Sequence, residues 1–388
     1  MKRLLQISTP VLLGLCLVAF VGIGYGCFVI PDTVQVISEQ DDYLPPLYSP
    51  SDQNVRFLHT VTVKKHHVQT TARVYAEPLG RAFGIKLYTE GVMIVRTDTV
   101  PTENGAVSPA QRAGLRAGDR ILSINGEAVH SNSETARLFT RSEGMPMRLR
   151  IRRESMTFET QLTPIRAQTD GQYRVGIWVR DSSAGIGTLT FFVPQYGMFA
   201  GLGHAVCDVD TGQILPLRQG EAVNVRIKGS YKGRSGTPGE LCGIFTTEPI
   251  GPILRNTETG LYGETDALPS DTEALPIALY YEVRQGEATI LADVDENGPR
   301  AYRVEITKLF VNPDAHQKNL IVKVTDPSLI EKTGGIVQGM SGCPILQNGM
   351  IVGAVTHVFL NDPLQGFGVY AQTMLEEMQQ LTRSRDAA

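Results

Sequence analysis

Two copies of one six-residue pattern hold the residues of this chain best suited to chemistry. Gly-x-Ser-Gly-x-Pro occurs as GRSGTP at residues 233–238 and as GMSGCP at residues 339–344. A serine hydroxyl is a weak nucleophile, so it needs a base to remove its proton and donors to hold the oxyanion that forms. A glycine two residues earlier permits a tight turn that aims two N–H groups at one oxygen. In the second copy these donors would belong to Gly339 and Ser341.

The sequence after each copy favours Ser341 over Ser235 as the nucleophile. Residues 344–359, PILQNGMIVGAVTHVF, predict an apolar strand, an Asn-Gly hairpin turn and a second apolar strand. A buried hairpin of this kind would hold a nucleophile loop firmly. Residues 239–252, GELCGIFTTEPIGP, have a weaker apolar pattern, which predicts an exposed loop around Ser235.

His204 is the best candidate for the base. It lies in MFAGLGHAVCDVDTG, where glycines let the backbone crowd a site, and it precedes Ser341 by 137 residues. That separation fits two residues carried by two β-barrels. His357 is the competitor, although a histidine on a strand is more often a structural residue. By spacing alone, the acid that orients the base could be any of four residues: Asp208, Asp210, Asp293 or Asp295.

Residues 83–165 form a separate unit. FGIKLYTEGVMIV predicts two apolar strands around a glycine turn, and SPAQRAGLRAGDRILSINGEAV predicts a short helix, a strand and an Asn-Gly turn. An amphipathic helix, SETARLFTRS, and two paired strands, MRLRIRRE and MTFETQLTPI, follow. This order, with the phrase AGLRAGD, resembles the PDZ domains of bacterial proteases.

The PDZ resemblance implies a peptide-binding groove. Phe83, Gly84 and Ile85 would form the carboxylate-binding loop, whose N–H groups hold the C-terminus of a peptide that adds a strand to the sheet. The alternative is a PDZ domain that only packs against its neighbour. Residues 166–388 are rich in glycine and short β-type runs, which predict a sandwich, a barrel or a pair of barrels, ending in an amphipathic helix, AQTMLEEMQQLTRSR.

The N-terminus indicates export. Met1-Lys2-Arg3 precedes an apolar run over residues 11–30, long enough to span a bilayer, which favours a membrane anchor. A cleavable signal peptide and a lipoprotein signal ending at Cys27 are the alternatives. The polar, proline-containing residues 31–55 indicate a stalk, and residues 56–82 suggest a few strands.

Composition excludes several classes of protein. The net charge of −4 gives no general attraction to nucleic acid. Cys207, Cys242 and Cys343 have no metal-ligand spacing, and no metal or cofactor is indicated. These three cysteines are either small buried thiols or include one disulfide, for example between Cys207 and Cys343.

Three stretches resemble the sporulation stage IV B serine peptidases of spore-forming Firmicutes. They are GIGTLTFFVP, the block around His204, and GGIVQGMSGCPILQNGMIVGAVTHVFLNDPLQGFGVY, and the resemblance covers roughly residues 84–375. It implies a chymotrypsin-like peptidase whose triad is His204, Asp326 and Ser341, with Asp326 in KVTDPSL. Asp326 lies only fifteen residues before Ser341, and the alternative is that it is a turn residue before Pro327.

The resemblance also implies the whole architecture. The fold would be mainly β, with an N-terminal membrane anchor, a PDZ domain and a chymotrypsin-like double β-barrel. The expected parts are an anchor or signal (1–30), a stalk and small β segment (31–82), a PDZ domain (83–165) and a serine peptidase domain (166–388).

The biology that the resemblance implies is signalling by cleavage. Such a peptidase is exported from the forespore into the space between two membranes and cleaves itself near its N-terminus. It then cuts a regulatory membrane protein of an intramembrane protease, which releases a late mother-cell sigma factor. The rival interpretations are a catalytically inactive PDZ adaptor tethered to the membrane and a structural exported β protein. The intact serine, histidine and glycine turn favour the enzyme.

Overall fold

The computed structural model describes three long stretches, residues 71–266, 273–310 and 318–386. It also describes five short pieces before them: 20–21, 33–37, 54–57, 61–65 and 67–70. The predicted anchor, apart from residues 20–21, and most of the predicted stalk lie outside the described residues. In the described part of the chain, no helix is long and apolar enough to cross a membrane. The early strands pair as β1 with β4 and β2 with β3; they are β1 (Thr33–Ile37), β2 (Asn54–Phe57), β3 (Val61–Lys65) and β4 (His67–Thr71).

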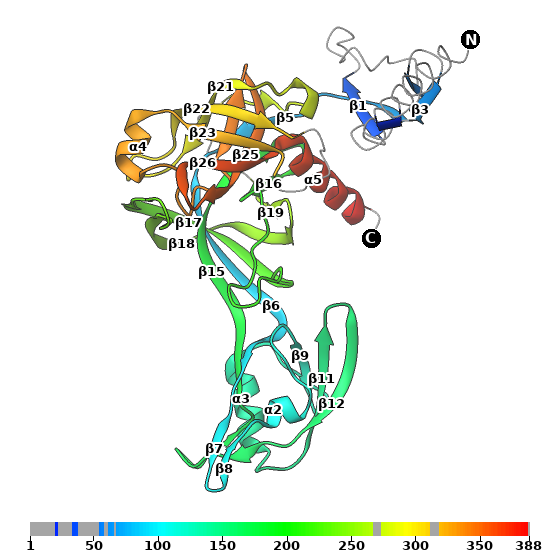
Figure 1. Cartoon of the computed structure of the whole chain (residues 1–388), viewed down its shortest axis with the longest axis vertical. Coiled ribbons are helices and arrows are strands. Elements are labelled where there is room, and N and C mark those ends of the chain that lie inside the picture. Colours follow the sequence, from blue (N-terminus) through cyan, green and yellow to red (C-terminus); the bar gives the residue numbers. More distant parts are fainter. Residues whose placement is uncertain are drawn as a thin grey trace, which may run out of the picture.

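The PDZ elements form one end of an elongated molecule (Figure 1). The two predicted helices are present, and serine side chains cap both N-termini by accepting backbone N–H groups, Ser108 for the first and Ser131 for the second. The Asn-Gly turn at Asn125 and Gly126 has the positive φ angles of its predicted type. The elements are α2 (Pro109–Arg112), α3 (Asn132–Arg141), β7 (Val100–Thr102), β8 (Gly105–Val107), β9 (Arg120–Ile124), β10 (Glu127–Ala128), β11 (Met147–Arg153), β12 (Met156–Leu162), β13 (Ile165–Arg166) and β14 (Tyr173–Arg174).

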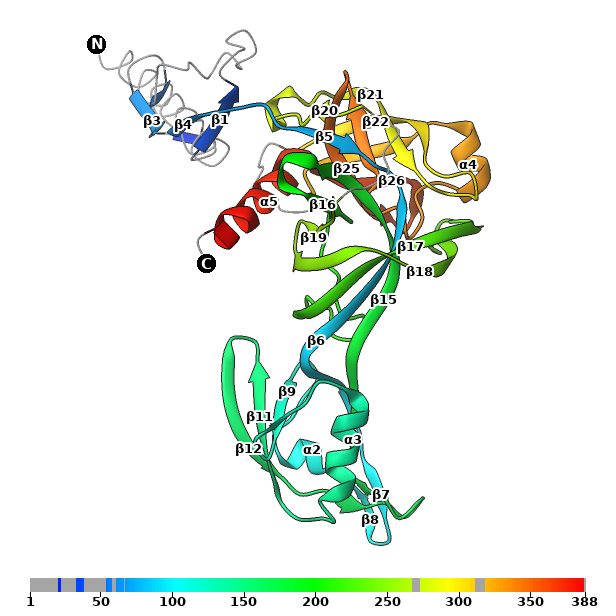
Figure 2. The ribbon, with the colours of Figure 1, turned by 180° about the vertical axis from the view of Figure 1, so that it is seen from behind.

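Two long strands join this end to the rest of the molecule, as Figure 2 shows. They are β6 (Ala82–Thr97) and β15 (Ile177–Val193), which pair antiparallel along most of their length. The sequence predicted two strands where β6 is one, because Gly91 was expected to turn the chain. Gly91 has a φ of +72°, yet the strand continues through it. Residues 83–89, expected in the PDZ unit, therefore pair within the first barrel.

The first barrel is a ring of six paired strands. Each member pairs with the next, and the pairing of β15 with β6 closes the ring. Its other members are β17 (Leu217–Tyr231), β18 (Glu240–Thr257), β19 (Gly260–Glu264) and β16 (Met198–Gly201). β5 (Tyr75–Pro78) continues the sheet from β15, and β20 (Leu275–Pro276) pairs with β5.

The second barrel is closed by six antiparallel strands. In β22 the side chains of Tyr302, Val304 and Ile306 are buried, whereas the residues between them are exposed, the alternation expected of a strand with one buried face. The strands, in spatial order, are β21 (Gly286–Ala292), β22 (Arg300–Leu309), β23 (Leu320–Val324), β26 (Asp362–Tyr370), β25 (Met350–Phe359) and β24 (Pro344–Gln347).

Short helical elements complete this end of the molecule. The predicted C-terminal helix is present, and two basic residues, Arg383 and Arg385, lie in its last turn, where they suit the helix dipole. One continuous hydrophobic core links the barrels, since Ile227 and Leu241 of the first pack with the interior of the second. The elements are α4 (Pro327–Thr333), α5 (Ala371–Asp386), η2 (Pro194–Tyr196) and η3 (Tyr280–Glu282). The mainly β part of the predicted fold class, with a PDZ-like end and β-barrels, is confirmed, whereas the N-terminal membrane anchor stays a prediction.

Candidate active site

Ser341 lies in the loop that enters β24 of the second barrel, and glycines shape that loop as predicted. Gly339 and Gly342 have φ angles of +96° and +99°, which favour glycine strongly. A Cβ on Gly342 would lie 2.0 Å from the carbonyl oxygen of Thr188, so no other residue fits there. Thr188 of β15 also donates its N–H to the Ser341 carbonyl at 2.9 Å and its hydroxyl to the Gly339 carbonyl at 2.7 Å. The first barrel thus fixes the loop of the second.

The N–H groups of Gly339 and Ser341 are available to a substrate. The neighbouring N–H groups of Met340 and Gly342 donate to Val337 and Val355 carbonyls. Among the described residues, no acceptor receives a hydrogen bond from the N–H of Gly339 or Ser341. Two free N–H groups at these positions are what an oxyanion hole requires, so the geometry agrees with the predicted donors.

His204 reaches the same place from the first barrel. Directly after β16, Leu202 and Gly203 have φ angles of +67° and +70°, and the Gly203 N–H bonds the Gly201 carbonyl at 2.9 Å. A left-handed leucine is strained, and such strain is frequent at functional sites. This tight turn brings His204 to an open cavity of about 410 Å³ that Ser341 and Gly339 also line.

The competing histidine lies beside His204. The rings of His204 and His357 have centroids 4.6 Å apart and are tilted by 36°, and both line the cavity. The structure therefore brings together Ser341, Gly339, His204 and His357 from both barrels.

Ser341 and His204 each bond a backbone carbonyl in this conformation. The Ser341 hydroxyl donates to the Thr356 carbonyl at 2.7 Å, and His204 Nδ1 lies 2.8 Å from the Ala205 carbonyl. Because a carbonyl oxygen only accepts, Nδ1 must carry the proton, which leaves Nε2 as the basic nitrogen. Sequence reasoning missed both carbonyls, since a backbone group leaves no signature in residue type.

Asp326 does not reach His204, which corrects the role that the resemblance implied. Its carboxylate caps α4, accepting the N–H of Ser328 at 2.9 Å, and it also accepts the N–H of Arg303 at 3.2 Å. It is not among the residues that line the cavity. Asp326 therefore occupies the position of a helix cap, which its sequence context before Pro327 also suits.

The other candidate acids also have different partners. Asp208 and Asp210 pair with Arg180, and Asp295 pairs with Lys332. Asp293 accepts the N–H of Ala82 at 3.3 Å. Within the described residues, no carboxylate hydrogen-bonds His204, and the Ala205 carbonyl takes the place at Nδ1 where an acid would lie.

Ser235 occupies a supporting loop. Its hydroxyl donates to the Asn361 carbonyl at 3.0 Å in an exposed setting, and among the described residues no histidine hydrogen-bonds this hydroxyl. The loop braces the nucleophile segment, because Gln338 and Gly239 share a backbone hydrogen bond of 2.8 Å. The first copy of the motif, GRSGTP at residues 233–238, is thus a structural turn.

The prediction that Phe83, Gly84 and Ile85 form a carboxylate-binding loop is wrong. They lie near the start of β6, where β15 pairs with one edge and β17 with the other, and Phe83 is fully buried. A strand paired on both edges cannot bind a peptide terminus.

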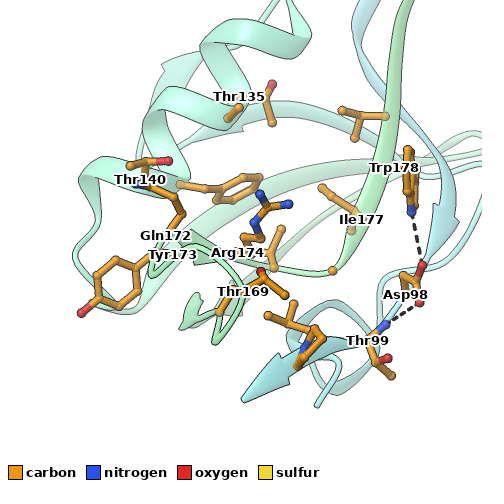
Figure 3. A pocket seen from close by; sticks show the side chains of 18 of the residues that line it. Asp98, Thr99, Thr135, Thr140, Thr169, Gln172, Tyr173, Arg174, Ile177 and Trp178 are labelled. Carbon is orange, nitrogen blue, oxygen red and sulfur yellow. Dashed lines mark hydrogen bonds between the residues drawn. The ribbon is translucent and has the colours of Figure 1, made fainter. Parts of the chain in front are cut away.

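The PDZ edge that a peptide would use is taken by the chain itself. Residues 177–180 of β15 pair with residues 93–97 of β6, beside α3. Val175 is buried in the PDZ core, and Ile177 and Val179 pack against that core. An open cavity of about 570 Å³ remains between α3 and this strand (Figure 3). A PDZ ligand adds a strand at a free edge, so this arrangement agrees with the alternative of a PDZ domain packed on its neighbour.

The cysteines form no disulfide in the described structure. Cys207 is exposed, Cys242 is partly buried and Cys343 is buried, so a Cys207–Cys343 bridge is absent and only one thiol is fully enclosed. Burial raises the pKa of Cys343 to about 12, so this thiol beside the oxyanion turn stays protonated and inert. The described residues also contain no group of three or more His, Cys, Asp or Glu side chains that could hold a metal ion.

Comparison with known families decides the identity. A family model described as SpoIVB peptidase S55 matches residues 171–375, more than half of the chain, and a PDZ model matches residues 105–153. The chain belongs to the SpoIVB peptidase S55 family. It is therefore a PDZ-containing serine peptidase, as the resemblance predicted.

Similarities to three individual proteins are weaker. A putative zinc metalloprotease of Lactococcus lactis is 31% identical over 97 residues, which are 25% of this chain and 22% of that protein, so the chain spans less than a quarter of its length. The HtrA-type protease AlgW with a decapeptide is 12% identical over 56% of each chain, with a TM-score of 0.31. A PDZ domain of an SdrC-like protein from Listeria monocytogenes is 21% identical over 23% of this chain and 87% of its own, with a TM-score of 0.20. The family assignment does not depend on these three.

In this S55 peptidase the environment keeps both histidines neutral. Burial lowers the pKa of His204 below its ordinary value of 6.5. The pKa of His357 is lowered to about 4, mainly by burial and further by charge repulsion from His204 and Lys318. A neutral His357 can stack on His204 without opposing the positive charge that a base acquires.

The first prediction concerns pH. If His204 is the base, it works only when neutral, so activity should rise with pH through the His204 pKa. Because that pKa is lowered, the inflection should fall below pH 6.5, and the rate should be constant above neutrality. The pH dependence of fluorophosphonate labelling measures it. An inflection well above 6.5 would contradict this account of the site.

The second prediction concerns Asp326. Asparagine can also cap a helix, so Asp326→Asn should change the labelling rate of Ser341 by less than about threefold, whereas loss of a triad acid costs about 10⁴ in kcat. Asp326→Ala should lower the free energy of unfolding by about 1–2 kcal/mol, because it removes the cap. Labelling kinetics and thermal denaturation of both variants give the two quantities. A loss of several thousandfold in folded Asp326→Asn would restore the acid role.

Proposed function

We propose that this chain is a serine endopeptidase in which Ser341 is the nucleophile and His204 is the base. The observation that carries the proposal is the meeting of His204 from one barrel and Ser341 from the other at a single cavity beside two free N–H groups. A base, a nucleophile and oxyanion donors in one place are the minimum for acyl transfer.

The reaction begins with a change of partner. The Ser341 hydroxyl leaves the Thr356 carbonyl by rotating about χ1 and turns toward His204 Nε2. Its oxygen then attacks the carbonyl carbon of the scissile peptide while Nε2 takes the proton. The N–H groups of Gly339 and Ser341 hold the oxyanion, and His204 next protonates the leaving amine. Water then attacks the acyl-enzyme while Nε2 takes a proton from it, and His204 returns that proton to the Ser341 oxygen as the ester bond breaks.

The Ala205 carbonyl takes the orienting part of the acid's role. By accepting from Nδ1, it fixes the tautomer and the direction of the ring. A neutral carbonyl stabilises an imidazolium less than a carboxylate does. The described conformation, in which Ser341 bonds Thr356, therefore corresponds to a resting enzyme.

The biological role is the part of the proposal that rests on the family. We propose that the peptidase is exported and membrane-anchored in the forespore intermembrane space and that it cleaves itself near its N-terminus. It then cuts a regulatory membrane protein of an intramembrane protease and so activates a late mother-cell sigma factor. The basic residues and apolar run at the N-terminus and the proline-containing segment at 31–55 support an anchor followed by a cleavable stalk.

Cleavage between two copies of the chain tests the endopeptidase activity. The Ser341→Ala chain serves as the substrate, because it cannot cut itself, and the unmodified chain serves as the enzyme. N-terminal sequencing of the products should show a cut before residue 83. A Ser341→Ala chain that stays intact with active, labelled enzyme would contradict self-cleavage, and the same assay with the regulatory membrane protein tests the signalling role.

A further inference from the structure

Arg180 lies where β15 passes from the PDZ end to the first barrel. Arg180 itself pairs with Met93 in the PDZ part of β6, whereas Ser182 pairs with Tyr88 in the barrel part. The register shifts between them, so Asp181 forms an irregularity at the junction. The backbone of Arg180 therefore lies directly between the part of β15 that pairs in the PDZ end and the part that pairs in the first barrel.

The side chain of Arg180 reaches the loop that follows His204. Its Nη1 lies 2.5 Å from Asp208 Oδ2, and its Nη2 lies 2.7 Å from Asp210 Oδ2. The Asp208 side chain has no exposed surface, while that of Arg180 is 31% exposed. A buried carboxylate requires a counter-charge, and Arg180 supplies it.

The other oxygen of Asp208 builds the turn of the loop. Oδ1 accepts the N–H of Asp210 at 3.1 Å, the N–H of Thr211 at 2.9 Å and the Thr211 hydroxyl at 3.0 Å. The backbone of Asp208 bonds Gln213 at 2.8 Å across the turn. Both carboxylate oxygens are therefore engaged, one by the turn and one by Arg180.

The loop is held at a second point next to His204. Asn256 accepts the N–H of Val206 at 2.8 Å and donates to the carbonyls of Val206 and Leu215 at 2.8 and 2.9 Å. The Ala205 carbonyl that bonds His204 immediately precedes Val206. Its direction is therefore set by a loop anchored at Val206 by Asn256 and at Asp208 by Arg180.

We propose that Arg180 is a positioning residue for His204, acting through Asp208 on the loop whose Ala205 carbonyl orients the imidazole. The inference rests on the proposed function of His204 as the base. The junction between the PDZ domain and the first barrel then contributes to catalysis, because a shift of β15 at Arg180 moves the loop that carries His204.

The test measures both catalysis and the state of the imidazole. Arg180→Gln, Arg180→Lys and the control Arg385→Gln are made in the whole chain of 388 residues. Arg385 of α5 pairs with Glu264 of β19, both side chains are well exposed, and neither residue lines the cavity. The first readout is the rate of fluorophosphonate labelling of Ser341, and the second is the pKa of His204 by NMR, with its signal identified by a His204→Gln variant.

Arg180→Gln should slow labelling about 10- to 100-fold, the cost of misplacing a catalytic group by about 1 Å. A loosened loop admits water to His204, so the pKa of His204 should rise toward 6.5. Among the described residues, His357 and Cys207 are the other titratable groups that line this cavity. Arg180→Lys should be intermediate, because an ammonium keeps the charge and loses the fork that spans two carboxylates. Arg385→Gln should change neither quantity.

Unchanged labelling and an unchanged His204 pKa in folded Arg180→Gln would overturn the proposal. If that variant does not fold, Asp210→Asn removes the exposed half of the fork and should slow labelling severalfold with a pKa shift in the same direction; no change in either would also overturn it. Absence of labelling in the unmodified chain would instead contradict the proposed function of Ser341. The NMR comparison would then still decide whether Arg180 controls His204.

Discussion

Ser341→Ala should abolish self-cleavage, lowering the rate by at least about 10⁴-fold. The reason is that no other described group at the cavity is an activated nucleophile. Cys207 lines the cavity, but desolvation and nearby carboxylates raise its pKa, and Cys343 is buried and protonated. The fold should be unaffected, since the Ser341 hydroxyl makes one hydrogen bond, to the Thr356 carbonyl. Gel analysis of the purified chain over time measures the rate.

The matched control is Ser235→Ala, in the other copy of the motif. Its hydroxyl makes a single exposed hydrogen bond to the Asn361 carbonyl, so its loss should change the rate by less than about twofold. Self-cleavage that survives in Ser341→Ala and disappears in Ser235→Ala would reverse the assignment of the two copies.

His204→Ala should reduce self-cleavage about as strongly as Ser341→Ala. Nucleophile and base act as a unit, so the double variant should be no slower than either single variant. His357, although its ring lies 4.6 Å from that of His204, should not replace the base, because His204 is the histidine whose Nδ1 is oriented by a carbonyl.

His130→Ala is the control for the histidine variant. His130 is exposed in the PDZ domain, and the bond it makes to Glu134 uses its backbone N–H, which alanine keeps. Thermal denaturation of each variant separates a catalytic loss from unfolding. Additive losses in the double variant, or near-normal cleavage in folded His204→Ala, would contradict the role of base.

Local sequence patterns predicted the local structure well, because their causes lie within a few residues. The two Asn-Gly turns have the positive φ angles that such turns need, with Asn348 and Gly349 at +51° and +73°. Serine caps, the alternation of buried residues in strands and the glycines around Ser341 follow equally from neighbouring residues. The proposed nucleophile and the proposed base are therefore the part of the candidate site that sequence alone could suggest.

Pairing between strands that are distant in sequence is the part of the fold that the sequence did not predict. Gly91 predicts a turn from its own neighbourhood, yet pairing of β6 with β15 and of its flanking parts with β17 and β9 keeps the strand continuous. The same pairing removes Phe83, Gly84 and Ile85 from any open loop. Tertiary context decides such cases, because strand formation depends on partners distant in sequence.

The third member of the site was also beyond sequence reasoning. The resemblance supplied Asp326, but the group at His204 Nδ1 is the Ala205 carbonyl, and every residue has a carbonyl. Arg180 could have been suspected from Asp208 and Asp210, since two carboxylates so close need a cation. No spacing rule, however, connects residues on a strand and a loop 28 and 30 positions apart.

The most direct test is fluorophosphonate labelling of the whole chain, followed by peptide mapping of the adduct. A fluorophosphonate reacts with a serine only where a base and an oxyanion hole activate it. The account predicts one adduct, on Ser341, that His204→Ala prevents. An adduct on Ser235, or none in folded protein under conditions where self-cleavage proceeds, would contradict the claim that Ser341 is the nucleophile.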